Sequence, residues 1–225
     1  LASIAFNSRV TFEEVYVEGI TRITPLDIKY GRELGYEIKL LAIAKEEEDG
    51  ILVRVHPAFI PNDHPLAAVS GVYNAVFVRG DAVDDLMFYG RGAGQMPTAS
   101  AVVGDLMEIV RNITRKDTGR ISCTCYEEKR VIPTSSQRAK FYIRMLAKDR
   151  PGVLAGIAGV MGNHEVSLAT VLQKDTNNGF AHLVFITHEV KESNLRDALT
   201  VLNGMSIVGA VENVIRLEGV KDYGE

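Results

Sequence analysis

The sequence predicts an α+β fold in two parts, a mixed or antiparallel sheet covered by helices followed by a compact βαββαβ unit. Short runs rich in Ile, Leu and Val alternate with Gly- and Asp-containing turns over residues 36–91, which is typical of antiparallel strands. Residues 141–217 change between strand-like and helix-like periodicity in the order β-α-β-β-α-β. Residues 111–140 are poor in large apolar side chains, which indicates a linker between the two parts.

The composition is that of an ordinary globular protein. Of 225 residues, 46% are apolar and 24% are charged, and the net charge is −4, which excludes a disordered or fibrous chain. No apolar run approaches the roughly 18 residues of a membrane-spanning helix, and there is no signal peptide, so we expect no membrane association. The only cysteines are Cys123 and Cys125, a pair that lacks the partners of a zinc site. Two free thiols favour a reducing compartment, so we expect a cytoplasmic protein.

The charge is distributed unevenly along the chain. Residues 1–110 carry a net charge of −7, residues 111–140 a net charge of +5 and residues 141–225 a net charge of −2. The basic stretch lacks the interleaved aromatic residues of a nucleic-acid site, so we interpret it as a solvated linker lying against an acidic neighbour. We therefore predict a first part (residues 1–110), a linker (111–140) and a second part (141–219), with no nucleic-acid partner.

The elements of the first part follow from local signals. Thr24-Pro25-Leu26-Asp27 predicts a helix start with a hydroxyl cap, and Gly35 ends that helix. Asp49-Gly50 is a strong turn signal between two apolar runs, which predicts a hairpin. The predicted strands are residues 36–44, 51–55, 72–79 and 82–89, and a further helix is predicted over residues 97–110.

A glycine-rich segment joins the last of these strands to the last helix. Gly90, Gly92 and Gly94 permit positive φ and leave room for a ligand close to the backbone. The N–H groups at the start of the following helix favour an anion or a polar ligand edge. A tight turn without a ligand explains the same pattern, and the spacing is not that of a P-loop.

The segments GYEIKLLAIAK, RVHPAFIPNDHPLAAVSGVYNAVFVRGD and FYGRGAGQMPTASAVVGDL resemble the substrate domain and closing segment of homoserine dehydrogenases. The resemblance covers residues 1–110 almost continuously. It implies a hydride transfer between a nicotinamide cofactor, NADP or NAD, and the pair L-homoserine and L-aspartate 4-semialdehyde. It also implies that Gly92, Ala93 and Gly94 neighbour the cofactor, while Pro97 and Thr98 hold the loop.

The chain departs from that family at its start. The dinucleotide-binding half, the catalytic Lys and the carboxylates that hold the substrate amine would precede the segment LASIAF, so we interpret Leu1 as a cut end. A hydride-transfer site needs a general acid–base and a bound nicotinamide. We therefore expect no catalytic residue in this chain and no turnover by it alone, with the cofactor bound mainly by the missing domain.

The second part has the pattern of a ferredoxin-like split βαβ unit. Strands are predicted over residues 140–148, 166–174, 180–188 and 206–217, with one helix after Asp149-Arg150-Pro151-Gly152 and another near Asn194. Asp149 can cap the free N–H groups of the first helix. Gly152 leaves the N-terminus of that helix open to a ligand carboxylate.

The segment DRPGVLAGIAGVMGNHEVSL, within residues 141–218, resembles an ACT domain, the amino-acid sensor of many biosynthetic enzymes. The resemblance implies an effector site where the first strand meets the first helix, and threonine is the first choice of effector. Its candidate residues are Asp149, Gly152, Val153, Leu154, Asn163 and Ser167, the last two acting from a paired domain. Asp149 as a helix cap alone, in a domain that only dimerises, remains the alternative.

Two hypotheses of different classes follow. In the first, the chain is part of a homoserine dehydrogenase of threonine, methionine and isoleucine biosynthesis, regulated by an amino acid. In the second, it is a stand-alone amino-acid-binding ACT regulatory or dimerisation module. Both predict a homo-oligomer, because an ACT domain presents a free edge strand and the sheet of the first part has an open face.

Overall fold

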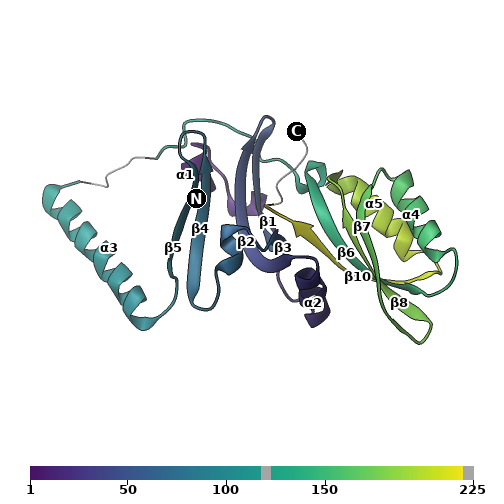
Figure 1. Cartoon of the computed structure of the whole chain (residues 1–225). Helices are drawn as coiled ribbons and strands as arrows, with labels where there is room; N and C mark the ends of the chain where they lie inside the picture. The colour runs from purple at the N-terminus through teal and green to yellow at the C-terminus, as the bar shows by residue number, and fades with distance from the viewer. Residues whose placement is uncertain (118–122, 220–225) are drawn as a thin grey trace.

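The computed structural model describes residues 1–117 and 123–219 and contains the two predicted sets of elements. Figure 1 shows the first part on the left and centre and the second part on the right. The elements are α1 (Ala2–Ala5), β1 (Tyr16–Val17), α2 (Pro25–Glu33), β2 (Tyr36–Glu47), β3 (Gly50–Pro61), β4 (Tyr73–Gly80), β5 (Asp84–Arg91), α3 (Gln95–Arg115), β6 (Arg138–Lys148), α4 (Val153–Asn163), β7 (Leu168–Asn177), β8 (Phe180–Thr187), β9 (Val190–Lys191), α5 (Glu192–Asn203) and β10 (Val208–Leu217), with short 3₁₀ turns at Phe12–Glu14, Pro65–Ala68 and Thr134–Ser136.

The two parts share one eight-stranded sheet. Its order is β1-β3-β10-β6-β8-β7, with β2 paired to β3 and β9 paired to β6, while β4 and β5 form a separate hairpin. Strand β10 pairs antiparallel with β6 and parallel with β3, so the last strand of the second part also completes the sheet of the first. The boundaries at residues 110 and 141 remain a prediction, because this sheet runs through both parts.

Strand β3 carries partners along both of its edges. Strand β2 covers one edge over its whole length. The other edge is shared by three segments: Ile51 pairs with residues 130–132, Val55 accepts a hydrogen bond from Glu18 N–H, and Phe59 accepts one from Glu218 N–H. Odd-numbered residues of β3 thus direct their backbone groups to this edge.

The predicted end of this strand at residue 55 is wrong, because β3 continues to Pro61. Proline cannot donate a ladder hydrogen bond, so the continuation of β3 through Pro57 requires an explanation. Pro57 lies between the segments that pair with Val55 and Phe59, so the absent N–H group falls in a gap between partners. The hairpin through Asp49-Gly50 is confirmed, with the strands longer than predicted.

The second part has the predicted βαββαβ order, with strands arranged β10-β6-β8-β7. Helices α4 and α5 cover one face of these strands (Figure 1). Alternate strand residues point into this layer and form a buried core with the helices; the largest members are Phe141, Ile143, Met145, Ile157, Met161, Phe185 and Leu195.

Helix α2 covers the opposite face of the same strands. Tyr30 of α2 is buried with Phe59 of β3 and with Tyr142, Val184 and Ile215 of the second part. The rings of Phe59 and Tyr142 meet edge to face with centroids 4.9 Å apart. A second hydrophobic core therefore lies between the two parts and joins them.

The segment before β6 lies against the acidic turn between β2 and β3. Lys129 forms an ion pair with Glu46, and the Arg130 guanidinium lies 3.5 Å from Asp49. Ile132 is buried, although residues 111–140 were interpreted as a solvated linker. The start of that stretch is also helical, because α3 runs to Arg115 instead of ending near residue 110.

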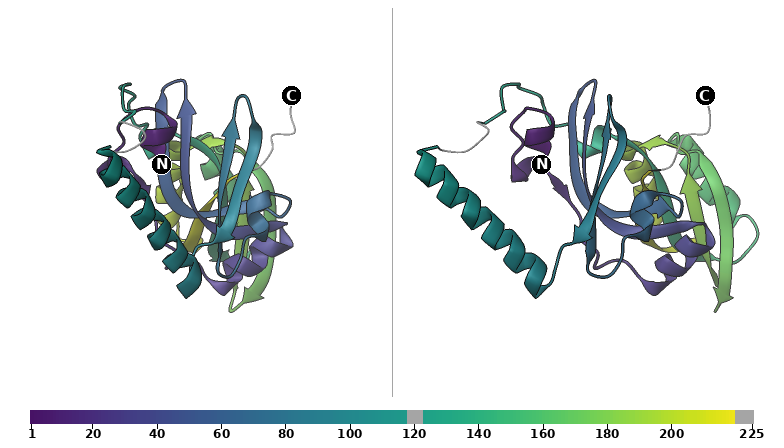
Figure 2. Two further views of the ribbon diagram at one scale, coloured as in Figure 1. Left: turned by 90° about the vertical axis from the view of Figure 1, so that its left-hand side faces the viewer. Right: turned by 60° about the vertical axis from the view of Figure 1, so that its left-hand side comes forward.

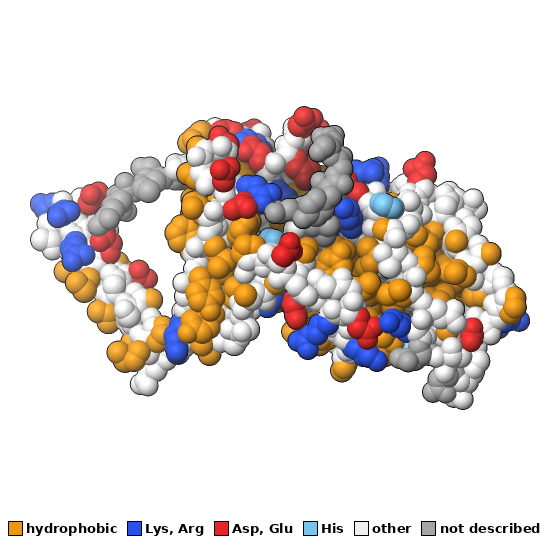
Figure 3. All heavy atoms as spheres, in the orientation of Figure 1, with side chains coloured by type: hydrophobic (Ala, Val, Ile, Leu, Met, Phe, Trp, Pro, Cys, Tyr) orange, Lys and Arg blue, Asp and Glu red, His pale blue; other side chains and the backbone are white. Residues whose placement is uncertain are grey.

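Helix α3 and the β4–β5 hairpin leave large apolar surfaces open. Figures 1 and 2 show α3 standing apart from the sheets, and Figure 3 shows apolar side chains gathered on α3 and on the hairpin. The apolar side chains of α3 are at least half exposed, as are several on the hairpin: Val102, Val103, Leu106, Met107, Ile109, Val110 and Ile113 on α3, and Phe88 and Tyr89 on β5. Surfaces of this kind mark contacts with other protein parts.

Candidate functional site

The glycine-rich loop begins where the β4–β5 hairpin ends. The β4–β5 register places Asn74 opposite Gly90, and the N–H of Gly92 donates to the carbonyl of Val72 at 3.1 Å. A Cβ atom on Gly92 would lie 1.8 Å from Nδ2 of Asn74, so a side chain there requires the Asn74 amide or the loop to move. The Asn74 amide therefore packs directly on the backbone of the loop.

The loop continues directly into α3. Gly94 is the N-cap residue with φ of 129°, a conformation that favours glycine. Its carbonyl accepts a hydrogen bond from the N–H of Thr98 at 3.1 Å, and a Cβ on Gly94 would lie 3.3 Å from the ring of Pro97. Pro97 and Thr98 thus contact the loop as expected. The first N–H groups of α3 point toward the loop, where they favour an anionic or polar ligand edge.

An aromatic stack lies at the base of the same loop. The rings of Tyr73 and Tyr89 are parallel within 10°, with centroids 4.8 Å apart. The guanidinium of Arg91 lies over the Tyr73 ring at 5.6 Å. These contacts tie the last residues of β5 to the first residue of β4, so the loop starts from a fixed point.

A cavity of about 410 Å³ lies where β6 meets α4 in the second part. Four of the predicted effector residues line it, together with residues from β6, β7 and β8: Ala147, Lys148, Asp149, Arg150, Pro151, Gly152, Val153, Leu154, Gln173, Ala181 and Leu183. Its polar groups are concentrated at the end of β6 and its apolar groups on the strands and on α4. This combination suits a small zwitterion with a short side chain.

Asp149 does not cap the helix, contrary to the cap expectation. Gly152 occupies the N-cap position with φ of 87°, and the Oδ1 of Asp149 instead accepts a hydrogen bond from Nε2 of Gln173 at 3.0 Å. The N–H of Asp149 donates to the carbonyl of Gly179. The carboxylate is therefore held at the cavity by β7 and by the β7–β8 turn, and Gly152 leaves the helix N-terminus open.

The structure does not bring all six predicted effector residues together. Asn163 ends α4 and Ser167 precedes β7, and neither lines the cavity of its own chain. Sequence analysis missed Gln173, Ala181 and Leu183, which reach the cavity through strand pairing. The alternation of side chains along β7 and β8 shows which residues share a face of the sheet. It does not give the register between the two strands, which decides which residues reach the cavity.

Ion pairs between buried charged side chains join the two parts of the chain. Asp27 of α2 is fully buried, and Arg144 of β6 donates to its Oδ1 at 2.7 Å while Asn213 of β10 donates to its Oδ2 at 2.8 Å. Burial raises the pKa of Asp27, but hydrogen bonds from Arg144, Asn213 and Thr24 outweigh burial and hold it below its ordinary value. The carboxylate thus stays ionised in the interior.

A second buried carboxylate lies at the β3–β10 junction. Glu218 forms an ion pair with Arg54 of β3, and Nε2 of His56 lies 3.5 Å from its Oε1. Burial raises the pKa of Glu218, but contact with His56 and the positive charges of Arg54 and Lys45 outweigh burial and lower it. Each pair links one part of the chain to the other.

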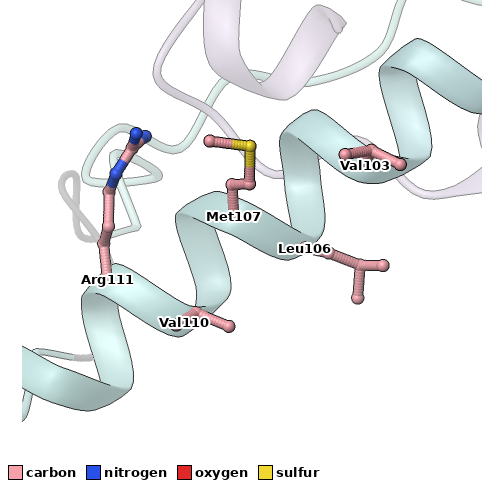
Figure 4. A pocket seen from close by; sticks show the side chains of 5 residues that line it. All are labelled: Val103, Leu106, Met107, Val110 and Arg111. Carbon is pink, nitrogen blue, oxygen red and sulfur yellow. The ribbon is translucent and has the colours of Figure 1, made fainter.

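The surface of α3 carries a further hollow. Figure 4 shows a shallow hollow on α3, lined by Val103, Leu106, Met107, Val110 and Arg111, which is the surface of one helix. Within residues 1–117 and 123–219, no cluster of His, Cys, Asp and Glu has the composition to hold a metal ion. None of the helices described there is long and apolar enough to cross a membrane.

Comparison with known proteins shows which families the two parts of the chain match. Residues 1–107 match the family model for homoserine dehydrogenase, and residues 141–205 match that for the ACT domain. A homoserine dehydrogenase of Synechocystis sp. is 43% identical over 226 residues, covering 96% of this chain and 52% of the relative. The chain matches homoserine dehydrogenases along almost its whole length. A Pseudomonas aeruginosa member of the family is 38% identical, with 97% of this chain and 52% of the relative covered.

The solved structures of the family show the same architecture. The crystal structure of a homoserine dehydrogenase from Thiobacillus denitrificans matches with a TM-score of 0.86 and 37% identity, covering 96% of this chain and 50% of that one. The chain spans about half the length of the curated relatives it matches. The resemblance inferred from the sequence is therefore confirmed, as is the α+β fold with an ACT domain.

Proposed function

We propose that the chain supplies the substrate-side sheet, the cofactor-closing loop and the regulatory domain of a homoserine dehydrogenase. In this reaction L-homoserine and L-aspartate 4-semialdehyde are interconverted with NAD or NADP, in the cytoplasm. The observation that carries the proposal is the contact between Gly92 and Asn74, which fixes the glycine-rich loop at the entrance of a helix. A loop of this kind admits a flat ligand to its backbone N–H groups.

The loop fits a nicotinamide cofactor in this structure. Gly92, Ala93 and Gly94 expose their backbone, and the first N–H groups of α3 are available to a polar ligand edge. When bound, the nicotinamide ring would accept or donate the hydride. The residues of this chain contribute by positioning the ring and by excluding water, because the proposed acid–base group belongs to the part of the family that the chain does not span.

Under this proposal, other protein parts cover the exposed apolar surfaces of α3 and of the β4–β5 hairpin. The exposed apolar face of α3 packs into the dinucleotide-binding domain, and the β4–β5 hairpin packs against a second copy of the chain. An isolated two-stranded hairpin is marginally stable at best, so a covering layer is needed. Val76, Val78, Leu86 and Phe88 share one face of this hairpin and would form the contact.

Reconstitution tests the catalytic proposal. We expect NAD(P)H-dependent reduction of aspartate semialdehyde when the chain is joined to the half of the Synechocystis relative that it does not span. The chain by itself is expected to give no turnover. Turnover by the 225-residue chain alone would refute the assignment of the acid–base group to the other half.

We further propose that the cavity of the ACT domain binds an amino acid, with threonine as the first choice. The N–H groups at Gly152 and Leu154 donate to the carboxylate of the effector, and the Asp149 carboxylate accepts a hydrogen bond from its ammonium group. Asn163 and Ser167 contribute polar contacts from a paired ACT domain. The support is the open helix N-terminus, together with the position of Asp149 at the cavity instead of at the helix cap.

Asp149→Asn is expected to weaken threonine binding about tenfold or more, because a charge-assisted hydrogen bond to the ammonium is lost. Isothermal titration calorimetry on the chain measures this change. Glu189→Gln is the matched control, since Glu189 pairs with Arg138 outside the cavity and its loss should leave the affinity unchanged. Equal affinities for Asp149→Asn and the control would contradict the assigned role.

A stand-alone regulatory module remains the second candidate function. The complete βαββαβ unit and its cavity favour it, because they need nothing outside the chain. Threonine binding together with failure of the reconstituted protein to turn over would support this candidate. Paired β7 edges explain the expected homo-oligomer in either case.

A further inference from the structure

We propose that helix α2 transmits the state of the effector cavity from the ACT domain to the glycine-rich loop. The proposal rests on the effector role given above and adds a route by which it regulates the first part of the chain. Figure 1 shows α2 on the side of the β6–β8 strands opposite to α4, so the cavity and α2 share the same strands from opposite faces.

Strand alternation connects the two faces residue by residue. On β7, Gln173 lines the cavity, while its neighbour Leu172 packs in the core formed with α2. The next residue, Lys174, forms an ion pair with Glu33 of α2 at 2.6 Å. On β8, Leu183 lines the cavity and the adjacent Val184 packs in the α2 core. A shift of a strand on ligand binding therefore reaches α2 through neighbouring side chains.

Buried polar contacts prevent α2 from moving independently of the ACT strands. Arg144 donates to Asp27 from β6, and Asn213 of β10 donates both to Asp27 and to the carbonyl of Arg22 just before the helix. Arg144 also pairs with Glu212 of β10. Helix α2 is bonded to two strands and packs on a close-packed core, so it moves with these strands as a unit.

The far end of α2 leads to the glycine-rich loop. A Cβ on Gly31 would lie 2.1 Å from the Phe59 ring, so the helix backbone lies directly on β3. After α2 the chain enters β2, where Nζ of Lys39 donates to the carbonyl of Val69 at 2.5 Å. Val69 lies three residues before Val72, whose carbonyl accepts a hydrogen bond from the N–H of Gly92. Side-chain contacts and short backbone segments thus lead from the cavity to the loop.

Hydrogen exchange on the chain, with threonine as the probe, tests the proposal. Threonine is expected to slow exchange in residues 25–33. Glu33→Gln should leave the threonine affinity unchanged while reducing this effect on α2 by about 2- to 30-fold, the range for a residue that carries coupling. Glu37→Gln is the matched control, because Glu37 pairs with Arg32 and not with an ACT strand, and it should retain the full effect.

A second measurement needs no ligand. Gln173→Ala alters the cavity wall and is expected to change exchange in α2 of the otherwise unaltered chain, and to change it less in the Glu33→Gln background. Unchanged α2 exchange for Gln173→Ala overturns the proposal, and so does an equal change in both backgrounds. If threonine fails to bind, the effector assignment falls, while this comparison still decides the role of α2.

Discussion

Replacing Asp27 by Ala is expected to lower the free energy of unfolding of the chain by about 3–5 kcal/mol, the usual cost of removing one partner of a buried ion pair. Arg144 is 2% exposed and would lose its Nε partner, while Asn213 and Tyr142 would lose an acceptor. Urea unfolding followed by circular dichroism measures the change.

Two further variants separate the ion pair from other roles of Asp27. Thr24→Ala removes the cap of α2, where the Thr24 hydroxyl accepts from Asp27 N–H, and should cost only about 1 kcal/mol. The double variant Asp27→Leu with Arg144→Met removes both charges and should recover part of the loss. A loss for Asp27→Ala no larger than that for Thr24→Ala would show that the buried pair contributes little.

Gly92→Val is expected to lower kcat/KM of the reconstituted dehydrogenase about 10²-fold, because small displacements of positioning groups have effects of this size. The valine Cβ would lie 1.8 Å from Nδ2 of Asn74, so either the loop or the Asn74 amide must move. The hydrogen bond from the Gly92 N–H to the Val72 carbonyl would be disturbed with it, and the cofactor would lose the backbone surface that the loop presents.

Gly90→Ala provides the control in the same segment. Nothing lies within 4 Å of a Cβ at Gly90, so this variant should keep the activity of the reconstituted protein. If the two variants have equal melting temperatures, the loss of activity in Gly92→Val arises from the loop and not from unfolding. Full activity of Gly92→Val would remove the main support for the cofactor-loop proposal.

The local signals in the sequence were sufficient for most elements of the fold. Thr24-Pro25 and Asp27 predicted the capped start of α2, and the reciprocal hydrogen bonds between Thr24 and Asp27 confirm it. Strand β3 was cut short at His56-Pro57, because only its partners along the open edge explain how proline is accepted there. Short strand β9 was not predicted, since it has two residues and no periodicity.

The candidate sites were predictable where they depend on one segment. Gly92 and Gly94 lie in a loop that the sequence marks by itself, and Asp149 lies just before a recognisable helix start. Gln173 was missed because its place depends on the register of β7 with β8, which contains an irregularity between Lys174 and Thr176. The ion pair of Asp27 with Arg144 could not be predicted, because the two residues lie far apart in the sequence.

The position of β10 has a consequence for synthesis of the protein. Residues 58 and 59 of β3 pair with residues 216 and 217, so this end of the β3 edge stays open until translation has added roughly 150 further residues. At ordinary elongation rates that delay is on the order of ten seconds. A nascent chain therefore exposes an unpaired strand edge on the ribosome, and premature termination anywhere in the ACT domain leaves that edge prone to aggregation.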